Sequence, residues 1–144
     1  MKYQIIEAKS LEEIQQVFQI RIEVFVNEQK CLPSEEFDDL DAVARHFLLF
    51  VDGIPAATGR FRKTEKGIKI ERIATLLSYR GKKLATFLIQ HIMKVAKEQF
   101  PEIHYFYLHA QQTVMPLYAS LGFTPFGETF IEADIVHQAM ELTN

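Results

Sequence analysis

A cluster of cations stands at the start of a predicted helix. The stretch YRGKKLAT, residues 79–86, places Arg80, Lys82 and Lys83 around Gly81, directly before the apolar-periodic segment LATFLIQHIMKVAKEQF. A helix N-terminus already carries about half a positive charge, so added cations are unfavourable unless an anion joins them. A glycine-containing turn that opens a helix also presents several backbone N–H groups, which suits phosphate. The stretch therefore predicts an anion site, although a solvated basic helix start would show the same pattern.

The composition limits the class of protein. The 144 residues fit one domain, residues 1–144, and a hydrophobic content of 48% with 12 phenylalanines indicates a packed core. The net charge of −3 excludes a global basic field for nucleic acid, so the partner is expected to be small. Because no signal-peptide pattern or long apolar run is found, we expect no membrane partner and a cytoplasmic location. The single cysteine and five histidines without ligand spacing predict neither a disulfide nor a metal site.

The elements that must position the basic turn follow from periodicity and turn residues. Ser10 and Glu13 form a capping-box pattern before the first helix, and Asp52-Gly53 predicts a hairpin turn. We expect helices over 11–25, 84–100 and 114–122, and strands over 2–8, 46–51, 54–63, 68–77, 104–110, 123–130 and 134–142. The acidic, irregular residues 27–44 are interpreted as a lid. This order predicts an α+β (mixed α/β) fold with helices on the faces of a central sheet.

Several segments of the chain, in order, resemble the GNAT family of N-acetyltransferases. RGKKLA follows IERIATLLSY, and RIEVFVNEQKC, HFLLFVDGIPAATGRF, LHAQQTVMPLYASLGF and GETFIEADIVHQAMEL look most like the ElaA-like branch. The resemblance covers nearly the whole chain. It implies a three-layer fold whose mixed, largely antiparallel, twisted sheet splays at the acetyl-CoA site. It also implies direct transfer of acetyl from acetyl-CoA to the primary amine of a small molecule or peptide, without a metal.

The resemblance also implies a cofactor site. Backbone amides of residues 81–85 would hold the acetyl-CoA pyrophosphate beside Arg80, and residues 73–75 would pair with the pantetheine amides like an added strand. Gln111, where the wider family often has asparagine, would supply a further amide. Lys83 stands where the family usually has a glycine; with an ordinary helical φ its side chain could point away, or its Cβ could weaken binding. The predicted set is Ile73, Ala74, Thr75, Arg80, Gly81, Lys82, Lys83, Leu84, Ala85 and Gln111.

Acetyl transfer to an amine needs a proton acceptor, a stabilised oxyanion and a proton for the departing thiolate. Tyr118 in LYASLGF matches the family tyrosine proposed to protonate the thiolate, and a backbone N–H near Ala74 would stabilise the oxyanion. The base stays open between Glu71, His109 and a water chain. Strand alternation puts Glu71 on the face of Ile73, where a salt bridge would explain it equally well. The predicted acceptor-pocket residues are Phe25, Glu28, Glu128 and His137.

Other hypotheses stay open. Lys83 in place of glycine favours a catalytically impaired CoA-binding module with a regulatory or interaction role. A domain for another nucleotide is disfavoured because the chain has neither a GxxxxGKS/T loop nor a GxGxxG turn. The acidic run EEFDDLD could attract a cationic acceptor, but we favour a solvated loop. We assign Cys31 no catalytic role, and the apolar strands are compatible with a homodimer.

Overall fold

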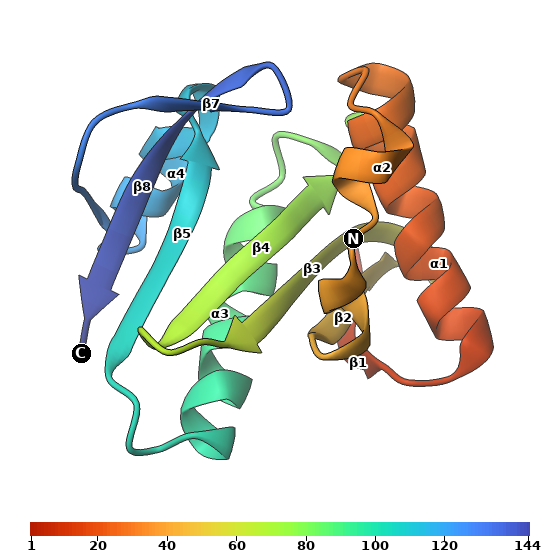
Figure 1. Cartoon of the computed structure of the whole chain (residues 1–144). Helices are drawn as coiled ribbons and strands as arrows, with labels where there is room; N and C mark the ends of the chain where they lie inside the picture. Colours follow the sequence, from red (N-terminus) through yellow and green to blue (C-terminus); the bar gives the residue numbers. More distant parts are fainter.

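An eight-stranded sheet runs through the molecule and carries helices on both faces (Figure 1). The computed structural model describes residues 1–144. The strands are β1 Tyr3–Ala8, β2 Arg45–Val51, β3 Ile54–Lys63, β4 Ile68–Thr75, β5 Tyr105–Gln111, β6 Thr124–Pro125, β7 Phe130–Glu132 and β8 Ile135–Thr143. The helices are α1 Leu11–Arg21, α2 Pro33–Glu36, α3 Leu84–Gln99 and α4 Met115–Ser120. None of these helices is long and apolar enough to cross a membrane.

The sheet has the order β1-β2-β3-β4-β5-β8-β6, with β7 paired to β8. Every pair is antiparallel except β4 and β5, which run parallel. These two strands pair only from Ile68 opposite Phe106 to Ile70 opposite Leu108 and then diverge toward their carboxyl ends (Figure 1). The predicted mixed, largely antiparallel sheet with splayed strands is therefore confirmed.

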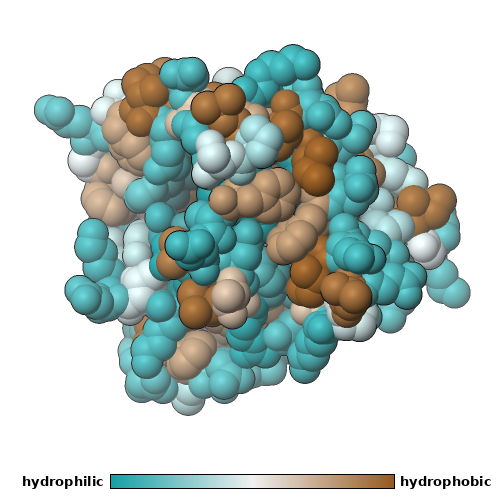
Figure 2. Space-filling model, turned by 45° about the vertical axis from the view of Figure 1, so that its right-hand side comes forward, coloured by the Kyte–Doolittle hydropathy of each residue, from teal (hydrophilic) through white to brown (hydrophobic).

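The two faces of the sheet carry cores of different size. On one face, α3 and α4 pack over a cluster of twenty buried residues that includes Leu88, Ile92 and Phe106. On the other face, α1 packs over eight buried residues, among them Val17 and Ile20. The surface over α1 and α2 mixes hydrophilic residues with several small hydrophobic groups (Figure 2). The larger of the two apolar cores thus lies between α3 and the sheet.

The first helix starts as predicted and ends differently. Ser10 Oγ accepts from the Glu13 amide and the Glu13 carboxylate accepts from the Ser10 amide, which confirms the capping box. Past Arg21 the chain continues as a π-helix over Ile22–Glu28 rather than as an α-helix to Phe25. The wider turn buries the consecutive residues Val24 and Phe25. Such π-helical insertions often occur at functional sites.

The hairpin turns have the expected backbone conformation, but the strand expected over 123–130 and the irregular segment expected over 27–44 differ from the prediction. Asp52 and Gly53 have φ values of 50° and 82°, and Ala133 and Asp134 have 51° and 61°, as two-residue hairpins require. The strand expected over 123–130 is broken, and only its two ends form β6 and β7. Residues 27–44, expected to be irregular, contain α2 and a 3-10 turn over Asp39–Ala42, both bound by arginines of the body.

Candidate active site

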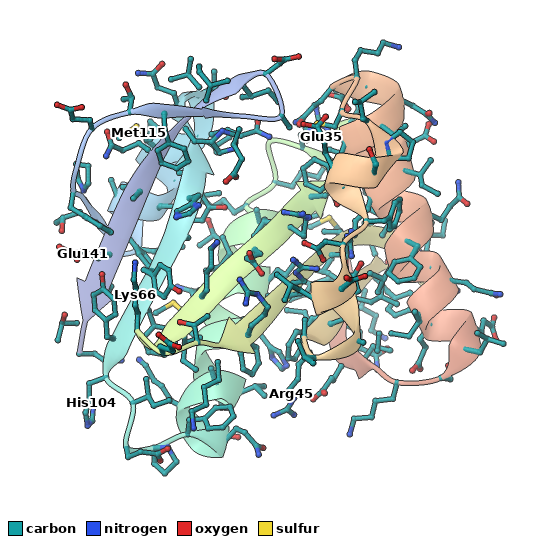
Figure 3. The ribbon with its side chains drawn as sticks, viewed as in Figure 1. Glu35, Arg45, Lys66, His104, Met115 and Glu141 are labelled. Atoms are coloured by element: carbon teal, nitrogen blue, oxygen red, sulfur yellow. The ribbon has the colours of Figure 1, made fainter.

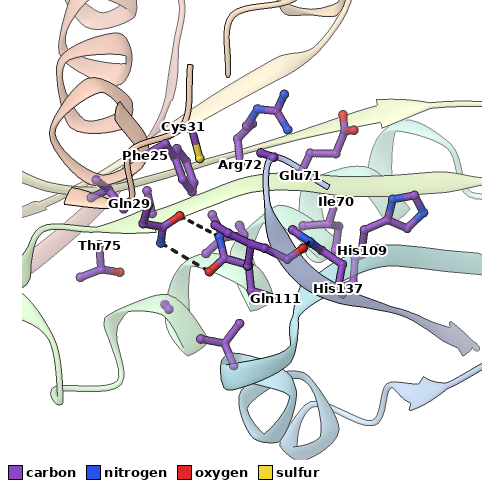
Figure 4. A pocket seen from close by; sticks show the side chains of 18 of the residues that line it. Phe25, Gln29, Cys31, Ile70, Glu71, Arg72, Thr75, His109, Gln111 and His137 are labelled. Carbon is purple, nitrogen blue, oxygen red and sulfur yellow. Dashed lines mark hydrogen bonds between the residues drawn. The ribbon is translucent and has the colours of Figure 1, made fainter. Parts of the chain in front are cut away.

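A cleft of about 870 Å³ opens where β4 and β5 diverge, bounded by the end of the π-helix, α2 and the start of α3. Figure 4 shows Phe25, Gln29 and Cys31 on one wall, facing Gln111, His109 and His137 on the other. The side-chain amides of Gln29 and Gln111 exchange two hydrogen bonds across the cleft, at 2.8 and 3.4 Å. In Figure 3, Glu35 lies near this end of the molecule and Arg45 lies at the opposite end. The cleft therefore joins segments that are far apart in the sequence.

Most of the predicted site residues meet in this one cleft. Those that line it are Phe25, Glu28, Glu71, Ile73, Ala74, Thr75, Arg80, Gly81, Lys83, Ala85, His109, Gln111, Tyr118 and His137. Three predicted residues do not line it. Glu128 lies in the loop between β6 and β7, Leu84 is buried in the apolar core, and the Lys82 ammonium lies over the Tyr79 ring, 5.8 Å from its centroid.

The turn before α3 has free backbone donors. The amides of residues 81–86 donate no hydrogen bond within the protein, and no side chain caps the helix. Lys83 is the N-cap residue and has φ +62° and ψ 20°, in the left-handed region. The expectation of an ordinary helical φ at Lys83 is therefore wrong: the lysine adopts the backbone conformation that glycine enters without a steric cost. The backbone amides of this turn are thus free to donate although Lys83 stands where the family usually has a glycine.

Arg80 is held by Glu28, a residue expected only to line the acceptor pocket. Its two terminal nitrogens each lie 2.7 Å from a Glu28 carboxylate oxygen, and its Nε donates to the Thr75 carbonyl at 2.9 Å. Hydrogen bonding to Arg80 lowers the pKa of Glu28, and the same pairing raises the pKa of Arg80. The predicted phosphate-binding arginine thus already has an anionic partner, one that bound pyrophosphate would have to compete with.

Tyr118 combines burial with access to the cleft. Its side chain is 7% exposed, packs edge-on against Phe123, and lines the cleft through its position on α4. No protein group hydrogen-bonds to the hydroxyl. Burial raises the pKa of Tyr118 well above its usual range, because an apolar environment disfavours the phenolate. The side chain therefore carries a proton at neutral pH, as a general acid must.

Glu71 does not have the surroundings of a general base. Three cations surround its carboxylate oxygens. Arg62 Nε lies at 2.6 Å, Arg60 Nη2 lies at 3.1 Å, and Lys69 Nζ lies at 3.2 Å. Burial alone would raise the pKa of Glu71, but the hydrogen bond from Arg62 and these charges outweigh it and lower the pKa to about 2. Such a carboxylate takes up a proton poorly at neutral pH. The predicted base role at Glu71 conflicts with this geometry, and the salt-bridge interpretation holds.

A β-bulge in β4 overturns the predicted alternation. Thr58 pairs with Ala74 and Arg60 with Glu71, so Arg72 and Ile73 together oppose Gly59. Arg72 has φ +58°. Ile73 then packs with α3, whereas Glu71 and Arg72 both face the α2 side, where they bind Arg60 and Glu36 respectively. Glu71 and Ile73 therefore lie on opposite faces of the sheet, contrary to strict strand periodicity.

Carboxylates of the acidic run EEFDDLD, residues 35–41, form ion pairs with buried arginines. Arg21, fully buried, binds Glu36 at 2.8 Å and Asp41 at 2.6 Å. Arg60, also fully buried, binds Asp41 at 2.6 Å and Asp38 at 3.1 Å. These carboxylates are neither the predicted solvated loop nor free to attract a cation. The sequence carried one signal for this network, because helical spacing places Arg21 on the buried face of the first helix.

His109 and His137 lie close to a residue that sequence reasoning missed. His109 follows Leu108, the last residue of β5 paired with β4, and its Nδ1 lies 3.5 Å from Glu132 Oε1. His137 Nδ1 donates to the Ile135 carbonyl at 2.7 Å, and its Nε2 lies 3.9 Å from Glu132 Oε2. The nearby His109 imidazole lowers the pKa of Glu132, although His109 Nδ1, a buried atom, makes no hydrogen bond in this structure. Phe130 packs against both imidazole rings.

Comparison with known proteins agrees with this architecture. Residues 7–144 match the family model described as the acetyltransferase (GNAT) domain. An acyl-CoA N-acyltransferase from Pseudomonas aeruginosa is 30% identical, with a TM-score of 0.86 and 99% of each chain covered. Escherichia coli ElaA is 26% identical, with a TM-score of 0.84 and 98% of each chain covered.

A more distant relative shares the fold alone. A GNAT family acetyltransferase from Elizabethkingia anophelis, solved with acetyl-CoA bound, is 12% identical. Its TM-score is 0.76, and the match covers 99% of this chain and 98% of that one.

Proposed function

Because this chain belongs to the GNAT acetyltransferase family, and so to the acyltransferases, we propose that it moves an acetyl group from acetyl-CoA directly to a primary amine in the β4–β5 cleft. One observation carries the proposal. The unbonded amides of residues 81–86 open onto the same cleft as Tyr118 and the free edge of β4. One continuous space thus contains backbone donors suited to pyrophosphate, a strand edge suited to the pantetheine amides, and the protonated hydroxyl of Tyr118.

The residues of the cleft fit acetyl-CoA. The amides of residues 81–85, at the N-terminus of a sixteen-residue helix, would hold the pyrophosphate, with Arg80 beside them. The β4 edge at residues 73–75 has no strand partner on the β5 side and would bind the pantetheine amides. Gln111 would add a side-chain amide. When bound, acetyl-CoA supplies an acetyl group activated as a thioester.

Tyr118 would act as the general acid. Its burial keeps the hydroxyl protonated, and since no protein group binds that hydroxyl, it is free to donate to a departing thiolate. A backbone N–H near Ala74, next to the bulge, would stabilise negative charge on the thioester oxygen. Both groups are held by well-packed elements, so they would need little reorganisation during the reaction.

His109 is the base we propose in place of Glu71. An alkylamine with a pKa of about 10.4 costs about 5 kcal/mol to deprotonate at pH 7, so a proton acceptor is needed. His109 stands at the point where β4 and β5 part, with Glu132 beside its Nδ1. If Nδ1–H points at that carboxylate, Nε2 is left with a lone pair to accept the proton.

The impaired-module hypothesis loses its main support. It was motivated by Lys83, yet Lys83 adopts the left-handed conformation of the missing glycine and leaves the cradle amides free. We therefore do not propose it.

The test joins binding with turnover. In isothermal titration with acetyl-CoA, Arg80→Ala should weaken binding about tenfold, because a charge-assisted hydrogen bond contributes roughly 1.5–3 kcal/mol. With an accepted amine, Tyr118→Phe should lower kcat about 10²-fold or more, whereas Tyr3→Phe, which changes an exposed residue outside the cleft, should not. Wild-type protein that fails to bind acetyl-CoA would overturn the proposal.

A further inference from the structure

The arginines and Lys69 that line the cleft are already paired with carboxylates, and Lys83, at the start of α3, is the lining cation without such a partner. Arg62 and Lys69 bind Glu71, at 2.6 and 3.2 Å. Arg72 binds Glu36 at 3.1 Å and Asp38 at 3.3 Å. With Arg80 held by Glu28, an acceptor carboxylate entering this end of the cleft would have to break an existing ion pair. These paired cations on β3, β4 and the turn before α3 therefore offer little to an anionic group.

Glu132 is in the opposite situation. It lines the cleft and is half exposed, and no lysine or arginine nitrogen lies within 4.0 Å of its carboxylate. Its only close basic neighbours are the two imidazoles, and its lowered pKa keeps it ionised at neutral pH. Lys69 contributes only a weaker, longer-range charge. Glu132 is thus a carboxylate without a cationic partner.

His137 presents a second acceptor toward Glu132. Its side chain is 9% exposed, and Nδ1 must be the protonated nitrogen because a carbonyl oxygen can only accept. When the ring is neutral, Nε2 carries a lone pair; this nitrogen has no hydrogen-bond partner in the protein and lies 3.9 Å from Glu132 Oε2. Two acceptors facing each other at this distance repel unless a donor lies between or beside them. An ammonium group has three N–H donors and no acceptor, which suits such a place.

We propose that Glu132, His137 and His109 form the acceptor subsite, and that its substrate class is alkylammonium compounds, such as aliphatic diamines, rather than amino acids. Glu132 and His137 Nε2 would accept hydrogen bonds from the ammonium. His109 would then take one of its protons. An α-carboxylate next to the amine would lie against Glu132 and be repelled, and the cleft arginines are already paired, so none of them is free to hold it. This inference deepens the proposed acetyl transfer and rests on it.

The test uses 1,4-diaminobutane and a matched pair of monoamines, 1-aminobutane and 2-aminopentanoate, which differ by one α-carboxylate. Titrated into protein saturated with CoA, the diamine and 1-aminobutane should bind, and 2-aminopentanoate should bind at least about tenfold more weakly than 1-aminobutane. Glu132→Gln should weaken diamine binding about tenfold, whereas Glu128→Gln, on the loop outside the cleft, should leave it unchanged. Histidine ¹⁵N spectra should show His137 protonated at Nδ1, with its Nε2 signal moving on diamine addition.

The outcomes separate the subsite from the reaction. Diamine binding that depends on Glu132, without acetyl transfer, would support the subsite and refute the transferase. Acetyl transfer to the diamine with an unchanged KM in Glu132→Gln would support the transferase and overturn the subsite. Equal binding of 1-aminobutane and 2-aminopentanoate, or no binding of the diamine, would also overturn the subsite.

Discussion

Replacing Lys83 by glycine should stabilise the protein, although glycine usually weakens a helix. Lys83 has φ +62° at the N-cap of α3, where an L side chain crowds its own backbone. Glycine has no Cβ and adopts this conformation freely. The expected gain comes entirely from relieving backbone strain, because no side-chain cap is lost.

The size of the gain follows from two opposing terms. The left-handed conformation costs a non-glycine residue about 1–2 kcal/mol. Glycine also makes the unfolded chain more flexible, which offsets about 0.4–1 kcal/mol of this. The free energy of unfolding should therefore rise by about 0.5–1 kcal/mol. At about 2.1 cal/mol/K per residue over 144 residues, this raises Tm by about 2–3 °C.

Thermal unfolding followed by circular dichroism is the assay, and Lys82→Gly is the matched control. Lys82 is the preceding residue and has no positive φ, so the same chemical change there should lower Tm by about 1–3 °C. Two neighbouring Lys→Gly variants should thus shift Tm in opposite directions. A decrease in both variants would refute the left-handed conformation at Lys83 as the source of strain.

Three further predictions concern the cofactor, the proton donor and pH. Glu28→Gln should tighten acetyl-CoA binding about two- to fivefold in titration calorimetry, because it frees Arg80 from an exposed pair; unchanged affinity would reject competition between Glu28 and phosphate. Tyr118→Phe should lower kcat about 10²-fold at every pH up to about 10, because the raised pKa of Tyr118 keeps its hydroxyl protonated over that range; an unchanged kcat would remove Tyr118 as the acid. The pKa of Glu71 is lowered from 4.5 to about 2 in the folded protein, so its ionised form stabilises the fold by about 3 kcal/mol. This contribution is complete above pH 4.5 and is lost as the pH falls toward 2. In urea unfolding, the difference between wild type and Glu71→Gln should accordingly be smaller at pH 3 than at pH 6, and an equal difference would contradict the ion network.

The sequence predicted the fold well where local chemistry decides the structure. The capping box at Ser10 and the Asp52-Gly53 hairpin depend on residues a few positions apart, and both form as expected. The helical spacing of apolar residues after residue 83 likewise predicted α3 correctly. The resemblance then supplied what periodicity does not give, namely a mixed sheet with splayed strands, and the structure identifies the parallel, diverging pair as β4 and β5.

Features that depend on distant partners were missed. The bulge at Arg72 arises from pairing with Gly59 and reverses which face Glu71 occupies. The Arg80–Glu28 pair joins residues 52 positions apart, and no local pattern marks it. Glu132 sits at the end of a three-residue strand, where its sequence context resembles any polar turn. In each case the side chain's role is set by the assembled sheet rather than by its neighbours in the chain.

The helices on the two faces of the sheet should unfold locally at different free energies. The α3 layer is held by a twenty-residue apolar core, whereas the α1–α2 layer combines eight buried apolar residues with ion pairs of Arg21 and Arg60. Amide hydrogen exchange should therefore be faster in α1 and α2 than in α3, and low pH should widen the difference. Phe25, Glu28 and Gln29 belong to the weaker layer, while the free amides of the cradle belong to the stronger one. One wall of the cleft can thus move to admit the proposed amine while the wall that we propose binds the cofactor stays fixed.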